Sequence, residues 1–128
     1  MQDEALMTAG AIGALTALVH SYLVRRKLSK ALRPVLSADG VFPDAAQRLT
    51  PLLLDFSGYN WFLGGLLLMS APYWLGAEGK VVAALAVGSS YAFAAIGNFW
   101  GTRGRHPGWV LYTIACGLLI FGAWRPIG

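Results

Sequence analysis

Four long apolar runs limit what this chain can fold into more than any other feature of its sequence. They cover about residues 5–24, 52–75, 81–100 and 109–124. Each is near the roughly 20 residues that an α-helix needs to cross the hydrocarbon core of a bilayer, although the last run is short. The chain is only 12% charged, whereas soluble domains carry about 25% charged residues. The sequence therefore predicts a membrane protein with four helical spans.

The basic residues lie almost entirely in two of the stretches between these runs. Of the ten Lys and Arg residues, two stand elsewhere, at Lys80 and Arg125. Since basic loops remain on the cytoplasmic side, we expect the loops at 25–51 and 101–108 to be cytoplasmic and both termini to be outside. The eight basic residues in these two loops are Arg25, Arg26, Lys27, Lys30, Arg33, Arg48, Arg103 and Arg105.

These patterns predict a single all-α domain over residues 1–128, an integral membrane four-helix bundle. The N-terminus lacks the basic start of a signal peptide, so we expect the first run to be retained. The lone cysteine, Cys116, excludes an intramolecular disulfide and a CxxC redox pair. The net charge of +4 does not point to nucleic acid, because the basic residues flank the spans, where orientation and anionic lipid account for them.

The long first loop contains several signals of local structure. Residues 25–33 extend the first helix as a basic amphipathic segment until Pro34, which we expect to end it. Asp39 and Gly40 indicate a turn. Pro43 followed by Asp44 is typical of a helix start, and the residues after it predict a short helix at the membrane interface.

Small residues recur at helical spacing in two of the spans. In lipid, such rows let helix backbones approach closely, which supplies the packing contacts that the hydrophobic effect does not. We expect the first and third spans to meet through them, while a row that faces an identical subunit or a partner is the alternative. The packing residues are Ala9, Gly13 and Ala17 in the first span and Ala84, Gly88 and Ala92 in the third.

Polar residues from three spans are expected at one depth in the membrane. His20 stands five residues before Arg25, hence roughly 7 Å inside the cytoplasmic edge at ~1.5 Å per residue. Asp55 and Asn98 lie at comparable depth. A buried ionisable group is costly and is a functional hypothesis by default. The candidate layer is His20, Asp55 and Asn98, with Ser21, Tyr59, Asn60 and Tyr91 as possible neighbours.

Several interpretations of this layer stay open. It can serve a proton step, hold the polar head of a ligand, or simply join the helices. Asp55 can instead form an interfacial ion pair with Arg48 or Arg26. With His106, His20 gives the two histidines that haem ligation requires, but their predicted depths differ, so we predict no cofactor, no metal site and no catalytic residue.

Two stretches resemble a loose group of small, functionally unassigned bacterial four-span membrane proteins. They are residues 20–28, which close the first run with a histidine, and residues 106–111, which open the last. In that group a Trp-His pair opens the second helix, whereas Leu54, Asp55 and Phe56 stand at the corresponding place here, so the second histidine is absent. The resemblance implies a bacterial inner-membrane location, with periplasmic termini, and no particular activity.

The predicted function is an accessory or scaffold subunit of a membrane complex, or a binder of a lipid or small apolar ligand. Expected partners are the lipid bilayer and other membrane subunits or further copies of the chain. The alternative is a membrane enzyme or carrier that uses His20 and Asp55. The membrane-associated glutathione and eicosanoid enzymes are similar in topology, and Gln47 and Arg48 resemble the residues at which their second helix enters the membrane. The Asn and Glu that this family has soon after are missing here.

Overall fold

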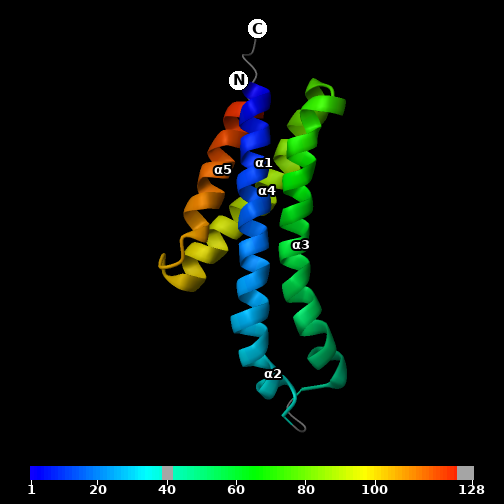
Figure 1. Cartoon of the computed structure of the whole chain (residues 1–128), viewed down its shortest axis with the longest axis vertical. Coiled ribbons are helices and arrows are strands. Elements are labelled where there is room, and N and C mark those ends of the chain that lie inside the picture. Colours follow the sequence, from blue (N-terminus) through cyan, green and yellow to red (C-terminus); the bar gives the residue numbers. More distant parts are fainter. Residues whose placement is uncertain (39–41, 124–128) are drawn as a thin grey trace.

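The computed structural model describes residues 1–38 and 42–123, which form helices joined by short turns (Figure 1). The all-α class is thus confirmed, and three helices are long and apolar enough to cross a membrane. Trp124, the predicted end of the last span, and the predicted Asp39–Gly40 turn lie outside the described residues. The elements are α1 (Gln2–Leu23), the π-helical segment η1 (Val24–Ser29), α2 (Lys30–Leu36), α3 (Asp44–Trp74), α4 (Ala77–Thr102) and α5 (Gly108–Ala123).

The first three elements form one unbroken helical rod of 35 residues. It continues through Pro34 and ends at Leu36, so the prediction that Pro34 ends the helix is wrong. Proline lacks an N–H and displaces the carbonyl four residues earlier. Since Pro34 stands in the last turn, this costs the rod a single hydrogen bond. The end is closed by Ser37, whose N–H and hydroxyl both donate to the Arg33 carbonyl, at 3.0 Å and 2.9 Å.

The second long helix, α3, begins at Asp44 directly after Pro43, which confirms the predicted start. It then runs for 31 residues to Trp74. The prediction of a separate short helix is therefore wrong, because the helix passes through Pro51 without a break. The fixed φ of proline fits a helix, and the loss at Pro51 is again a single hydrogen bond.

Helix α1 packs against α3 on one side and α5 on another, whereas α4 packs mainly against α5. The predicted close contact of the first and third spans, α1 and α4, is wrong. The Tyr91 side chain of α4 lies against Gly13 and holds these two backbones apart. The closest approach of α1 is to α3, at Gly10 and Gly65. A Cβ at Gly65 would lie 2.6 Å from the Gly10 carbonyl oxygen.

The predicted packing residues thus serve different neighbours. Ala9, Gly13 and Ala17 are buried at the centre of the bundle. Ala84 is buried, and Gly88 faces Leu119 of α5, so the α4 row packs within the α4–α5 pair. Ala92 is half-buried.

The outer surface is strongly apolar. Among the exposed large side chains are Leu85, Phe93 and Trp100, which retain 69%, 76% and 83% of their accessible surface. Soluble monomers rarely expose contiguous apolar surface on this scale. The surface of the bundle therefore favours contact with lipid or with other helices.

The rod formed by α1, η1 and α2 and the helix α3 extend together beyond the turn between α4 and α5 (Figure 1). We call this extension, residues 25–36 and 44–54, the basic hairpin. Arg103 and Arg105 lie in the nearby α4–α5 turn, so we call this end of the bundle the basic end. The hairpin carries six of the chain's ten Lys and Arg residues: Arg25, Arg26, Lys27, Lys30, Arg33 and Arg48.

The contact at Gly65 can be tested by adding one methyl group. Gly65→Ala places its Cβ 2.8 Å from that of Ala14, so we expect overpacking to lower the unfolding free energy by about 1–3 kcal/mol. Gly97→Ala is the matched control, because no atom lies within 4 Å of its added Cβ. It should stabilise α4 by about 0.5–1 kcal/mol. Thermal unfolding in mild detergent, followed by circular dichroism, measures the stability of both variants. Equal shifts of their melting temperatures in the same direction would contradict the close contact at Gly65.

Candidate functional site

The residues of the predicted polar layer lie in three separate places. His20 and Asn98 line a cavity between α1, α4 and α5. Asp55 and Tyr59 line a groove between α1 and α3. Asn60 lines a third hollow, between α3 and α4. The structure thus brings His20 and Asn98 together. Asp55 of α3 lies apart from them, in the groove on another side of α1.

The first of these, which we call the α1–α5 cavity, has a volume of about 260 Å³. Its apolar lining includes Leu15 and Val19, which are also exposed on the outside of the bundle. Its lining also includes the polar side chains of His20, Asn98 and His106, together with Thr16 and Tyr112. The cavity therefore joins an outward apolar face to a small group of hydrogen-bonding side chains.

An aromatic row fixes the inner wall of this cavity. The His20 ring meets Trp61 of α3 edge-on, with ring centroids 4.9 Å apart. Trp61 contacts Tyr112 of α5 at 5.3 Å, and Tyr112 contacts Tyr91 of α4 at 5.1 Å. Each such contact adds roughly 0.5–1.5 kcal/mol beyond the area it buries. The row includes one ring from each of α1, α3, α4 and α5, so it holds His20 in a defined position.

His106 is held by the turn between α4 and α5. Arg103 and Gly104 adopt positive φ values of 51° and 73°, and the Gly104 N–H donates to the Phe99 carbonyl at 2.8 Å. This left-handed helix end turns the chain back toward the cavity. The His106 N–H then donates to the Thr102 hydroxyl at 3.2 Å. The backbone around His106 is thus fixed on both sides.

The His106 ring also has a defined hydrogen-bonding role. Its Nδ1 accepts the N–H of Gly108, the first residue of α5, at 3.0 Å. A neutral imidazole has one donor and one acceptor nitrogen, so Nε2 carries the proton. A Cβ at Gly108 would lie 2.9 Å from Nδ1, which explains the glycine at this position. The sequence placed His106 in the loop at 101–108 but did not reveal its place in the cavity. The one available signal was the run His106, Pro107 and Gly108 at the start of the last helix.

Asn98 offers the complementary group. Its side-chain Nδ2 donates to the Ala94 carbonyl one turn earlier, at 2.8 Å. The amide oxygen keeps its lone pairs and can accept from a bound molecule. Two residues that line the cavity thus keep a hydrogen-bonding group without a described partner, the Nε2–H of His106 and the amide oxygen of Asn98.

Tyr112 adds an unusual feature to the inner wall. It is 1% exposed, and its hydroxyl has no hydrogen-bond partner among the described residues. A buried hydroxyl without a partner costs about 1–3 kcal/mol. A bound molecule whose polar group reached this hydroxyl would remove that cost.

Asp55 forms an ion pair with Arg25, and its Oδ1 lies 3.0 Å from the Arg25 Nε. This is the interfacial kind of pairing that the sequence left open, although the partner is neither Arg48 nor Arg26. An exposed pair of this type contributes up to about 1 kcal/mol. Arg26 instead donates to the Tyr22 hydroxyl. The acidic group is therefore directed to the surface between α1 and α3.

Asn60 is exposed on α3 and donates to the Ser90 hydroxyl of α4 at 3.4 Å. The hollow around this pair measures about 350 Å³ and opens between the two helices. Helices α3 and α4 make less contact than α1 and α3 do. The pair therefore joins two neighbouring helices that make comparatively little contact.

Within residues 1–38 and 42–123, no three His, Cys, Asp or Glu side chains gather as metal ligands would. The two nitrogens of His106 are both occupied, one as acceptor and one as N–H, so its neutral ring has no free lone pair for a metal. Comparison of the chain with protein-family models, curated proteins and solved structures finds no match. The function must therefore be argued from the site.

The proton position on His106 is directly measurable. In protein labelled with ¹⁵N-histidine at about pH 9, where imidazole rings are neutral, we expect Nε2 of His106 to be protonated and Nδ1 bare. The ¹⁵N shifts report this tautomer, and His106→Gln assigns the signal by removing it. A protonated Nδ1 would contradict the Gly108 hydrogen bond and the donor that it leaves facing the cavity.

Proposed function

We propose that this chain is a bacterial inner-membrane protein with four spans, which binds an apolar molecule with a small hydrogen-bonding head in the α1–α5 cavity. The single observation that carries the proposal is the composition of that cavity. Its wall is almost wholly apolar, and two of the residues that line it, His106 and Asn98, each keep one hydrogen-bonding group that no described residue uses, a donor and an acceptor.

The membrane location is favoured by the apolar helices and by their exposed Leu, Phe and Trp side chains. The distribution of charge favours one orientation. The basic hairpin and the α4–α5 turn would be cytoplasmic. At the other end, Lys80 is neutralised by Asp3, with Nζ and Oδ1 2.6 Å apart. This end, which includes the N-terminus, would be periplasmic.

The size of the cavity narrows the class of ligand. Sites that enclose a whole drug-sized molecule measure roughly 300–1,000 Å³. At about 260 Å³, this cavity suits the head of a longer molecule whose tail continues along exposed Leu15 and Val19 into the bilayer. A head with both a carbonyl and a hydroxyl group would satisfy His106 and Asn98 together. An uncharged lipid or a carbonyl-bearing isoprenoid has this chemistry.

A native mass spectrum of protein extracted in mild detergent tests this proposal. We expect the wild-type chain to carry an adduct of one defined mass, whereas Asn98→Ala and His106→Ala lower its occupancy about tenfold, the effect of ~1.4 kcal/mol. Asn60→Ala is the matched control, because it removes the same kind of side chain, an asparagine amide, outside the cavity. Equal occupancy in all variants, or no adduct in the wild type, would refute ligand binding at this cavity.

A role as accessory subunit is the second candidate, and the Asn60–Ser90 pair favours it. An amide exposed to lipid is costly, and a helix of a partner subunit would cover it. We expect Asn60→Leu to abolish a larger assembly in the same spectrum while Asn98→Ala leaves it intact. Gly13 is unsuitable for this test, because a side chain there would collide with Tyr91 within the bundle.

A membrane enzyme or carrier that uses His20 with Asp55 has less support. Asp55 is paired with Arg25, whereas His20 faces Trp61 and the cavity. A proton relay between His20 and Asp55 would require this ion pair to open first.

A further inference from the structure

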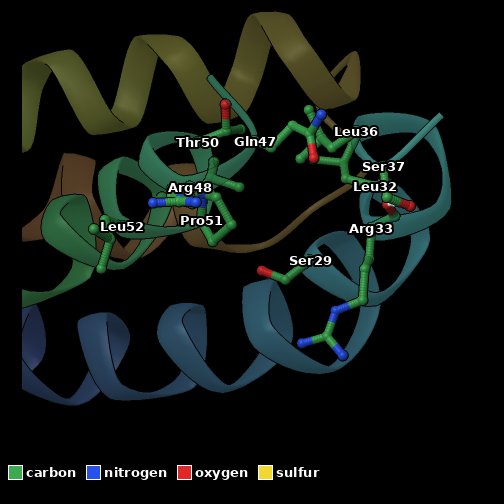
Figure 2. Close-up of a pocket in the computed structure, with 11 residues that line it drawn as sticks. Ser29, Leu32, Arg33, Leu36, Ser37, Gln47, Arg48, Thr50, Pro51 and Leu52 are labelled. Carbon is green, nitrogen blue, oxygen red and sulfur yellow. Dashed lines mark hydrogen bonds between the residues drawn. The ribbon is translucent and has the colours of Figure 1, made fainter. Parts of the chain in front are cut away.

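The basic hairpin contains a further hollow, which we call the hairpin groove. It has a volume of about 510 Å³ and lies between α2 and the start of α3. Figure 2 shows that the two helices contribute one arginine each, Arg33 from α2 and Arg48 from α3. The apolar part of the lining consists mainly of Leu32, Leu36, Leu52 and Leu54.

Most other polar groups of the groove are already engaged. The hydroxyls of Ser37 and Thr50 donate to carbonyls of their own helices, and the Gln47 side-chain nitrogen donates to the Phe42 carbonyl. The two guanidinium groups have no ion-pair partner among the described residues. The groove therefore offers guanidinium donors beside an apolar lining, which is the pattern that an anionic amphiphile requires.

The charge around the groove is also strongly positive. The described residues of the basic hairpin include six Lys and Arg and one acidic residue, Asp44. Asp55, one residue beyond the hairpin, is taken by Arg25. An anion at Arg33 and Arg48 thus meets a surplus of unneutralised cations. Arginine binds phosphate through two parallel hydrogen bonds, a geometry that suits a phosphate head group.

The position of the groove relative to the proposed membrane identifies the anion. The Arg25–Asp55 pair marks where α1 and α3 leave the apolar spans. Arg33 stands eight residues beyond Arg25, and Arg48 seven residues before Asp55, hence ~12 Å and ~10 Å further out along their helices. The head-group layer is about 5–8 Å thick on each side of the bilayer. Long arginine side chains extend this reach toward the membrane.

We propose that the hairpin groove binds an anionic phospholipid of the cytoplasmic leaflet, with its phosphate between Arg33 and Arg48 and the adjoining acyl carbons against the leucines. This inference shares only the membrane location with the proposed function. The two sites use different helices and different residues, so one can fail without the other. A phospholipid fits the groove better than free phosphate does, because phosphate alone leaves the leucines exposed.

The test uses the full-length protein in nanodiscs made of phosphatidylglycerol and phosphatidylcholine with identical acyl chains. The lipids that stay bound after transfer to detergent are counted by native mass spectrometry. We expect the wild type to retain one phosphatidylglycerol with at least tenfold preference. Arg33→Gln/Arg48→Gln should lose this preference. The matched control is Arg103→Gln/Arg105→Gln, which removes the same charge from the other basic loop and should keep it.

Four outcomes would overturn the proposal. They are equal retention of the two lipids by the wild type, an unchanged preference in the groove variant, an equal loss in the control, and displacement of the lipid by millimolar inorganic phosphate. The last would show that a free anion fills the site. If the double variant does not fold by circular dichroism, Arg33→Gln and Arg48→Gln are measured singly, and each must lower the preference severalfold.

Discussion

The close contact between α1 and α3 is the constraint on which the rest of the structure depends. Gly10 and Gly65 let the two backbones approach until a Cβ on either would collide with the other's carbonyl. At this distance the two backbones are in van der Waals contact, and such contacts supply dispersion energy that holds the pair together. Because the contact keeps the two helices side by side, they leave the bundle together and form the basic hairpin (Figure 1).

The α4–α5 pair is attached to this framework through large side chains. Tyr91 inserts against Gly13, and Tyr112 contacts Trp61. Helix α5 also packs closely against α1, where a Cβ at Gly122 would lie 3.1 Å from the Gln2 carbonyl oxygen. The α1–α5 cavity lies further along this pair, beside the Tyr112 ring that forms part of its lining.

The sequence was sufficient to predict the helices but not how they pair. Apolar length predicts the α-helical class, and Pro43 before Asp44 predicts the start of α3. The small-residue rows correctly indicate packing surfaces, yet α1, α3 and α4 all carry small residues, and the choice of partner depends on Tyr91. Pro34 and Pro51 show a related limit. A proline predicts the loss of one hydrogen bond, whereas the fold decides whether the helix ends there.

The candidate site was predictable in its residue types and not in its grouping. Helical depth placed His20, Asp55 and Asn98 at one level, but depth does not determine which face of a helix a side chain occupies. Arg25 and Asp55 pair beside the α1–α3 groove, while His20 contacts Trp61 and lines the α1–α5 cavity. At the opposite end, the Asp3–Lys80 ion pair and the fit of Gly122 against Leu6 tie the helix ends together. In the proposed orientation, a ligand would therefore reach the α1–α5 cavity from the cytoplasmic leaflet, where its donor and acceptor groups lie.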